Sequence, residues 1–195
     1  MNNSGNPLFP IFVKIDQINI LVVGGGYVGT EKVTALLNND PDAHITVVAR
    51  EICQELKSLV ANKPKIRLLE RPFMYDDLTG RDLLFLATDN HELHIEIKAE
   101  AQKRHLLTNV ADTPAICDFY LGSTVKKGDL KIGISTNGKS PTLAKRIKEY
   151  LNEALPDNTQ SLLDNLKSIR DRLKGDMEAK IKALDAVTEG WLKDK

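Results

Sequence analysis

Short apolar runs alternate with longer stretches of helical spacing along the first part of the chain. The apolar runs are brief and rich in β-branched residues, which is typical of strands buried on both faces of a parallel sheet. The stretches between them place apolar residues three and four apart, as on one face of a helix. The pattern predicts strands at 20–23, 44–48 and 66–69, with helices that carry Val28, Val33, Leu36 and Leu37 and then Ile52, Leu56, Leu59 and Val60.

The same alternation continues to residue 110 and predicts an α/β fold. A β-α-β-α-β core is the mononucleotide-binding half of a doubly wound parallel sheet, so residues 1–113 are expected to form a Rossmann-type domain. The apolar lead-in at 7–14 is expected to lie against the edge of the sheet. The remaining elements are expected as a short helix at 75–79, a strand at 82–87, a helix capped by the polar cluster at 88–90 and carrying Leu93, Ile97 and Ala101, and a fifth strand at 106–110.

Beyond Pro114 the pattern changes to a small α+β unit. Residues 119–125 and 130–135 read as a β-hairpin, and Ser140 places an N-cap residue before a proline at the first position of a helix that ends near Pro156. A hairpin and one helix cannot bury much surface alone, so residues 114–155 are expected to form a homodimer interface. Residues 156–195 are expected to form two helices broken at Gly175, with apolar faces from Leu162, Leu163, Leu166, Ile169 and Leu173 and from Ile181, Leu184, Val187 and Trp191.

The first strand passes into its helix through a turn with the spacing Gly-x-Gly-x-x-Gly. Gly24 can make the tight turn, Gly26 has no Cβ to keep a pyrophosphate away, and Gly29 lets the helix lie close to the strand. The helix N-terminus offers unpaired N–H groups to phosphates. The context predicts a dinucleotide site, and the alternative is a glycine-rich turn without a ligand.

Other candidate cofactor contacts follow the neighbouring strands. Ligands of open α/β sheets bind beyond the carboxyl ends of the strands, which places the glycine loop, Arg50, Thr88 and Asp112 on one rim. Where many NAD enzymes carry an acid for the ribose hydroxyls, this chain has Arg50 followed by Glu51. Arg50 could face the 2′-phosphate of NADP or could be a solvated charge at a helix start, whereas Glu51 is compatible with NAD. Spacing alone leaves both cofactors open.

Composition and charge narrow the class of protein. The 195 residues include 27 Lys+Arg and 27 Asp+Glu, so no overall field would recruit nucleic acid or an anionic membrane. No apolar run approaches the roughly 18 residues that span a bilayer, and the N-terminus does not read as a secretion signal, so a cytoplasmic location is expected. Cys53 and Cys117 form no CxxC and are expected to pack. His91 and His94 could share a metal, but exposed helix histidines are commoner and no third ligand is evident, so no metal site is expected.

Five motifs occur in order along the chain. They are Pro-Ile-Phe at 10–12, Val-Val-Gly-Gly-Gly-Tyr-Val-Gly at 22–29, Ala-Thr-Asp at 87–89, Asn-Val-Ala-Asp-Thr-Pro at 109–114 and Ile-Ser-Thr-Asn-Gly-Lys-Ser-Pro-Thr-Leu-Ala-Lys-Arg at 134–146. Together they resemble the precorrin-2 dehydrogenases, the dehydrogenase/ferrochelatase part of siroheme synthases, over roughly residues 7–155. The methyltransferase domain of some siroheme synthases has no counterpart here, so the chain resembles the stand-alone form.

The resemblance implies an NAD-dependent oxidation of precorrin-2 to sirohydrochlorin, followed in some members by insertion of ferrous iron. It favours NAD over NADP, and it implies that Asp112 is the key acidic residue. Some bacterial members carry a phosphorylatable serine in the turn before the helix; the matching position is Thr136, preceded by Ser135. The implied cofactor contacts are Gly24, Gly26, Tyr27, Val28, Arg50 and Glu51.

Oxidation of a reduced tetrapyrrole gives a hydride to the nicotinamide and releases a proton. The motif puts the Asp112 carboxylate at a strand end beside the cofactor, where it can accept that proton; the alternative is an N-cap before Pro114. The substrate carries many carboxylates, so cations must gather locally, although any one of them could be a solvated surface charge. Substrate contacts are expected from Asn109, Ser135, Thr136, Lys139 and Arg146, with Lys126, Lys127, Lys131 and Lys145 in the same unit.

A second class of function competes with the enzyme. Rossmann units also act as ligand-gated regulators, so a nucleotide-sensing domain is the alternative. The block after Asp112 favours the enzyme, because a pure sensor has no reason to carry it.

Overall fold

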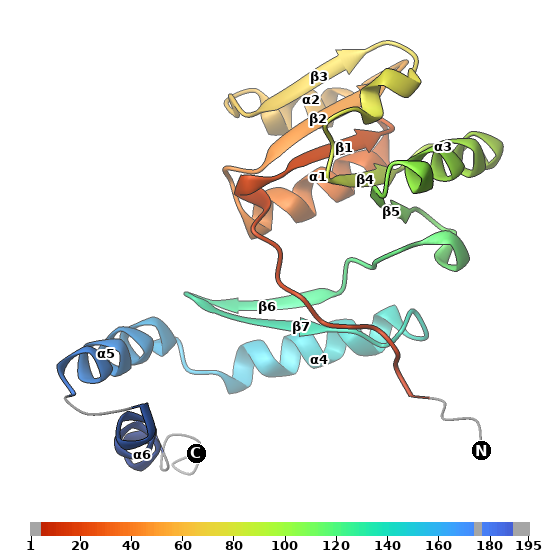
Figure 1. Ribbon diagram of the computed structural model, residues 1–195. Helices are drawn as coiled ribbons and strands as arrows, with labels where there is room; N and C mark the ends of the chain where they lie inside the picture. The colour runs from red at the N-terminus through yellow and green to blue at the C-terminus, as the bar shows by residue number, and fades with distance from the viewer. Residues whose placement is uncertain (1–4, 174–176, 189–195) are drawn as a thin grey trace. The chain divides into compact units, whose positions relative to one another are not determined.

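The computed structural model describes residues 5–173 and 177–188 and divides into two compact units (Figure 1). One unit is Ile11–Leu121. The other combines Met1–Pro10 with Gly122–Lys195. The predicted break at Gly175 and the predicted packing residue Trp191 lie outside the described residues.

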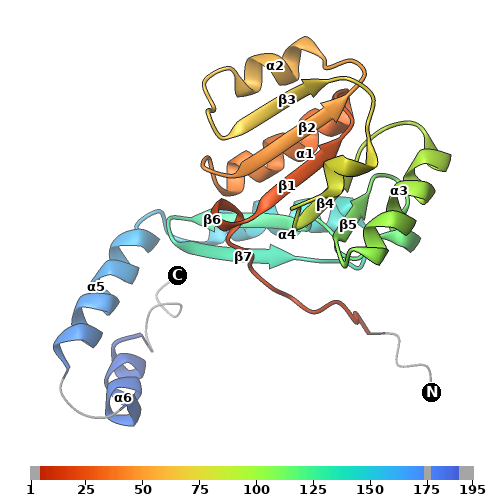
Figure 2. The same cartoon turned by 45° about the horizontal axis from the view of Figure 1, so that its top comes forward.

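The first unit is built on a five-stranded parallel sheet in the order β3-β2-β1-β4-β5 (Figure 2). This order confirms the predicted Rossmann-type α/β fold and puts the topological switch between β1 and β4. The strands are β1 Asn19–Val23, β2 His44–Ala49, β3 Ile66–Glu70, β4 Leu83–Leu86 and β5 Leu107–Val110. The helices are α1 Tyr27–Asn39, α2 Gln54–Val60 and α3 His91–Lys103, with short 3-10 helices η1 Ile15–Gln17, η2 Tyr75–Leu78 and η3 Pro114–Ile116.

Side chains of the central strand β1 belong to two hydrophobic clusters, one on each face of the sheet. Ile20 and Val22 belong to the cluster that includes side chains of α1 and α2, whereas Leu21 and Val23 belong to the cluster that includes α3. All four side chains are buried. Burial on both faces is why this run contains no polar residue, and it fixes the carboxyl end of β1 in the middle of the sheet.

The second unit has a β-hairpin packed against a helix. Strands β6 Ser123–Lys127 and β7 Leu130–Ile134 pair antiparallel, and α4 Pro141–Ala154 packs mainly on β6. Ser140 caps α4, since its Oγ accepts from the backbone N–H of Leu143 at 3.1 Å, and Pro141 occupies the first turn as predicted. The chain continues through α5 Thr159–Arg172 and α6 Met177–Thr188.

Two expectations differ from the structure. Within the unit that holds the sheet, residues 11–12 of the lead-in do not pack against the sheet edge, because Ile11 and Phe12 are 62% and 70% exposed. The strand expected at 119–125 begins only at Ser123. Residues 117–119 instead hydrogen-bond along β5, which is why the first compact unit extends to Leu121, past the predicted boundary at residue 113.

Candidate functional site

Four strands of the first unit end in register at one edge of the sheet. Val23 of β1 is aligned with Val48 of β2 and with Leu86 of β4, and Leu86 is aligned with Val110 of β5. The residues just beyond these strand ends therefore share one rim. They are Gly24 after β1, Arg50 after β2, Thr88 after β4 and Asp112 after β5, as the sequence predicts.

The glycine loop combines close backbone packing with one open position. Gly24 has φ +127°, and a Cβ there would lie 2.2 Å from the Ala87 carbonyl oxygen. A Cβ on Gly29 would lie 2.2 Å from the Gly24 carbonyl oxygen. A Cβ on Gly26, at the N-cap of α1, would meet no atom within 4 Å. The loop thus leaves free space beside the helix N-terminus, so the residues present fit a dinucleotide pyrophosphate.

The middle glycine, Gly25, was not among the predicted cofactor contacts, but it joins the loop to the turn after β2. Its carbonyl oxygen accepts from the Cys53 N–H at 2.9 Å, and a Cβ on Gly25 would lie 2.6 Å from the Glu51 carbonyl oxygen. The run of three glycines at 24–26 is the sequence signal that could have identified Gly25. The glycine loop and the turn after β2 therefore form one packed backbone unit.

Thr30 and Cys53 reinforce this junction with side chains. The Thr30 hydroxyl donates to the Gly26 carbonyl oxygen at 2.9 Å and lies 3.3 Å from the Cys53 Sγ. The hydrogen bond with Thr30 is the main cause that lowers the pKa of the Cys53 thiol. Cys53 also packs against the core, as predicted, so its side chain links the cofactor rim to the hydrophobic cluster.

Arg50 and Glu51 are exposed on the turn between β2 and α2. The turn is pinned from behind by Glu70 at the end of β3, whose carboxylate accepts from the Ile52 N–H at 3.0 Å and pairs with Lys57 at 3.0 Å. Within the described part of the chain the Arg50 side chain makes no hydrogen bond or ion pair. Its guanidinium is therefore free to meet a ligand at the rim.

Thr88 is held by a histidine that is buried, contrary to the expectation that this helix histidine is exposed. His94 is 3% exposed, and its Nε2 lies 2.8 Å from the Thr88 hydroxyl and accepts from the Thr88 N–H at 3.3 Å. Burial is the main cause that lowers the pKa of His94, with the charge of His91 adding to it. A neutral imidazole with the proton on Nδ1 suits these contacts. In the described ranges no three His, Cys, Asp or Glu side chains are grouped as metal ligands.

Asp112 is exposed and lies in the left-handed region with φ +56°. The N-cap alternative is wrong, because Thr113 holds that position before η3 and makes no side-chain cap bond. No hydrogen bond or ion pair involves the Asp112 carboxylate among residues 5–173 and 177–188. A free carboxylate on the cofactor rim is available to take a proton.

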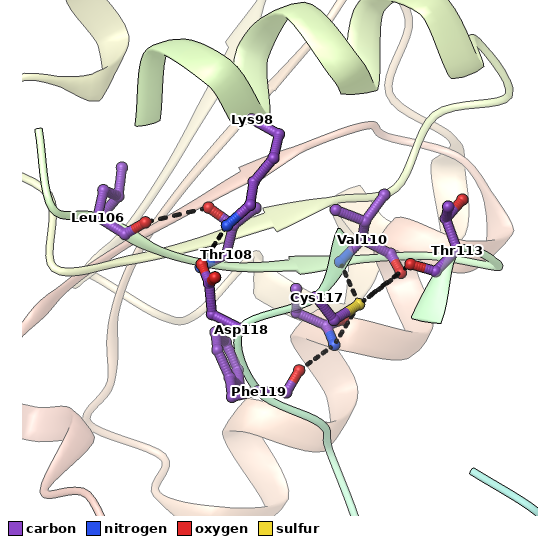
Figure 3. A network of polar contacts seen from close by, with 9 residues as sticks. Lys98, Leu106, Thr108, Val110, Thr113, Cys117, Asp118 and Phe119 are labelled. Atoms are coloured by element: carbon purple, nitrogen blue, oxygen red, sulfur yellow. Dashed lines mark hydrogen bonds and ion pairs between the residues drawn. The ribbon is translucent and has the colours of Figure 1, made fainter. Parts of the chain in front are cut away.

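Asn109 is buried, and its side chain hydrogen-bonds to the segment that follows Asp112. Its amide donates to the Phe119 carbonyl oxygen at 2.9 Å, and Cys117 accepts from the Val110 N–H at 3.2 Å (Figure 3). Contact between Asn109 and substrate stays a prediction. The structure gives it a direct part in shaping the rim.

The predicted substrate residues of the second unit lie around one turn. Asn137 and Gly138 both have positive φ, and the Lys139 N–H donates to the Thr136 carbonyl oxygen at 3.1 Å, as in a type I′ turn. The Thr136 hydroxyl donates to the Ser140 carbonyl oxygen and accepts its N–H, both at 3.2 Å, so it links the turn to α4. Ser135 is exposed, and its Oγ accepts from the Asn137 N–H at 3.1 Å.

The cations of this unit include both paired and unpaired side chains. Lys127 pairs with Asp157, and Lys145 pairs with Glu149. Lys139 and Arg146 are exposed, and within the described ranges neither makes an ion pair. Lys126 and Lys131 stand directly opposite each other on the hairpin. Like charges in this position are destabilising by themselves, and an anion would relieve the repulsion.

Comparison with known proteins decides the family. Residues 11–123 match the model described as putative NAD(P)-binding, and residues 127–154 match the model described as sirohaem biosynthesis protein central. The chain belongs to the putative NAD(P)-binding family. Membership agrees with the open glycine loop, and it confirms the predicted class of cofactor.

The named relatives of this NAD(P)-binding chain agree with the resemblance predicted from the motifs. It is 36% identical over 154 residues to a siroheme synthase of Pseudoalteromonas atlantica, which covers 79% of this chain and 33% of the relative. It is 32% identical over 183 residues to a siroheme synthase of Psychrobacter arcticus, covering 94% of this chain and 32% of the relative. The chain thus spans about a third of the length of these relatives.

A solved structure extends the match along nearly the whole chain. SirC, precorrin-2 dehydrogenase, is similar with a TM-score of 0.76 and 25% identity over 96% of this chain and 93% of that one. Across the helices described here, none is long and apolar enough to cross a membrane.

Proposed function

We propose that the protein is a dehydrogenase that oxidises precorrin-2 to sirohydrochlorin with NAD. The observation that carries the proposal is that one rim holds both an open glycine loop at Gly26 and the Asp112 carboxylate, which has no hydrogen-bond or ion-pair partner among the described residues. The similarity to SirC, precorrin-2 dehydrogenase, and to siroheme synthases supports the choice of substrate.

The chain's residues divide the work of this reaction. Bound NAD would supply the hydride acceptor. The N–H groups at the start of α1, with Gly24 and Gly26, would bind its pyrophosphate, and Arg50 and Glu51 would flank its adenosine ribose. Asp112 would accept the proton that the tetrapyrrole loses with the hydride, so that precorrin-2 and NAD⁺ give sirohydrochlorin, NADH and a proton.

Insertion of ferrous iron into the product is a second activity of the same proposal. Iron is a substrate here, and its insertion requires that the pyrrole nitrogens lose their protons. Asp112 is exposed and unpaired among the described residues, so the same carboxylate can take these protons. Chelation and dehydrogenation would then share one residue.

We also propose a homodimer formed through residues 114–155. The helix α4 buries only Ala144, while Leu143 and Tyr150 remain 50% and 69% exposed. Covering these side chains with a second copy would remove apolar surface from water. Light scattering of the purified protein at micromolar concentration should give twice the chain mass, and a cytoplasmic location is expected with this assignment.

The decisive experiment is a turnover assay with both cofactors. Purified protein is mixed with precorrin-2 and either NAD or NADP, and NAD(P)H absorbance is followed. The proposal expects reduction of NAD that depends on precorrin-2. The competing nucleotide sensor would bind NAD without reducing it, and that outcome would reject the enzyme.

A further inference from the structure

The loop that carries Asp112 is closed by a short segment that runs back along the edge strand β5. Side chains of this segment accept hydrogen bonds from the outward N–H groups of β5. The Thr108 N–H donates to the Asp118 carboxylate at 2.8 Å, and the Val110 N–H donates to the Cys117 Sγ at 3.2 Å (Figure 3). The Asp118 N–H donates in return to the Thr108 carbonyl oxygen at 2.8 Å. The edge of the sheet is thus closed by side chains in place of a sixth strand.

Asp118 is also the ion-pair partner of a buried lysine. The Lys98 side chain, 7% exposed, reaches from α3 and donates its Nζ to the same Asp118 oxygen that accepts from Thr108 (Figure 3). A lysine with this burial has to be paired. One carboxylate oxygen therefore joins three elements, namely α3, β5 and the segment after η3.

Stability alone is a weak reason for this arrangement. The Lys98 charge is taken out of water, whereas the Asp118 side chain stays 30% exposed. Because burying a charge costs free energy, replacing a buried ion pair by apolar side chains of similar volume is often neutral or stabilising. What an ion pair offers in addition is a fixed geometry at a defined point of the chain. That point is the end of the loop 111–117, whose start is fixed to β4 by the Ala111 N–H donating to the Leu86 carbonyl oxygen at 2.9 Å.

Asp112 depends on this loop because, among residues 5–173 and 177–188, its carboxylate makes no hydrogen bond or ion pair. Its position is set by the backbone, which bends through φ +56° and is tied by the Thr113 hydroxyl donating to the Ala111 carbonyl oxygen at 3.2 Å. We propose that Lys98 and Asp118 are positioning residues, which hold the loop 111–117 so that the Asp112 carboxylate stays at the cofactor rim. The role of Asp112 rests on the proposed function, while the anchoring of the loop can be measured without it.

The test compares Asp118→Ala in two backgrounds. In the otherwise unchanged protein, Asp118→Ala should lower kcat about tenfold or more and leave the KM for NAD within about twofold, since misplacement by about 1 Å can cost up to about a hundredfold. In the Asp112→Asn background the same change should lower kcat by less than about twofold, because the residue through which it acts is already disabled. Equal losses in both backgrounds would show that Asp118 does not act through Asp112.

A matched control separates positioning from general loss of stability. Asp77 is likewise a carboxylate that accepts from a backbone N–H, that of Met74 at 2.9 Å, and pairs with a cation, Arg71. Asp77→Ala should lower the melting temperature but leave kcat unchanged well below that temperature. If Asp118→Ala does not fold with Lys98 unpaired, the double variant Lys98→Met/Asp118→Ala removes the buried charge and is measured in its place.

Amide hydrogen exchange tests the anchoring even if precorrin-2 is not turned over. Asp118→Ala should speed exchange in a peptide spanning 111–117 and leave β1 and β2 unchanged, whereas Asp77→Ala should not affect 111–117. Unchanged exchange in this loop would overturn the proposal. Absence of turnover by the unmodified protein would instead overturn the proposed function and leave this result standing.

Discussion

Gly29 lies so close to Gly24 that a Cβ on Gly29 would come within 2.2 Å of the Gly24 carbonyl oxygen. The obstacle is backbone, which cannot rotate away as a side chain can. Gly26 lies between these two glycines in the sequence, but a Cβ there would meet no atom within 4 Å, and its φ of −89° suits any residue. Replacing the three glycines of this motif should therefore have different effects, since a Cβ clashes with the backbone at Gly24 and Gly29 but not at Gly26.

The first prediction contrasts Gly26→Val with Gly29→Val. Gly26→Val should fold with a melting temperature within a few degrees of the unmodified protein, because only the N-cap preference for glycine is lost. It should lose NAD binding, because its side chain would fill the space of the pyrophosphate. Gly29→Val should lose about 3 kcal/mol or more of stability, since α1 must move away from β1. Thermal melts and NAD titration by calorimetry distinguish the two. Normal NAD affinity in Gly26→Val would remove the glycine loop from the cofactor site.

The second prediction concerns Arg50 and Glu51, which compete to set the cofactor preference. If NAD is the cofactor, Glu51→Ala should weaken NAD binding about tenfold, because a charge-assisted hydrogen bond to the ribose is lost. Arg50→Ala should leave NAD affinity within about twofold. Kd values of the unmodified protein and of both variants for NAD and NADP check this. Tighter binding of NADP than of NAD by the unmodified protein, lost in Arg50→Ala and kept in Glu51→Ala, would assign the protein to NADP.

The third prediction is a pH dependence that comes from His94. Burial holds the pKa of His94 below its ordinary value, so the unfolded chain binds a proton there more readily than the folded one. The free energy of unfolding that depends on neutral His94 is fully present above the ordinary histidine pKa of about 6.5 and is lost as pH falls below it. Protonation would also end acceptance from the Thr88 N–H.

Melting temperatures of three proteins check this linkage. The unmodified protein should lose stability between about pH 7.5 and pH 5.5, and His94→Gln, which keeps an acceptor but cannot titrate, should lose less. His44→Gln is the control, because His44 is exposed on β2 and is not among the charges that shift the pKa of His94, so this variant should behave as the unmodified protein does. Identical pH profiles for His94→Gln and the unmodified protein would exclude His94 as the source.

Local patterns were enough to predict the sheet and the common edge at which its strands end. Apolar runs and helical stripes are short-range signals, and parallel strands bring their carboxyl ends together automatically, so Gly24, Thr88 and Asp112 fall on one edge as expected. The burial of His94 could not be predicted, because its position at the first turn of α3 is also typical of exposed residues. Its exposure depends on the chain that covers it.

The segment that closes the edge of β5 could not be predicted from the sequence for a related reason. Residues 119–125 have a strand-like pattern, but the first of them, Phe119, makes other contacts. Its carbonyl oxygen accepts from the Asn109 amide, and its ring packs edge-on against Phe85 with centroids 5.4 Å apart. The Lys98 to Asp118 pair joins a helix to a loop with no spacing rule between them. Pairings of this kind follow from tertiary structure, which local propensity does not encode.

The last prediction is that Asp112 carries catalysis and not folding. Asp112→Asn suits the site unusually well, because asparagine tolerates the left-handed φ of +56° and no bond of the carboxylate is lost within the described residues. The variant should bind NAD normally and melt within a few degrees of the unmodified protein. It cannot accept a proton, so kcat should fall by about 10²- to 10⁴-fold.

Asp112→Ala is the informative companion of that variant. It also removes the base, but alanine is strained at positive φ by roughly 1–2 kcal/mol, so it should lose stability as well as activity. Comparing the two separates the carboxylate from the backbone bend. If Asp112→Asn dehydrogenates precorrin-2 at nearly the normal rate, the proton must leave to water or to another group, and Asp112 would be needed only for the bend of the loop.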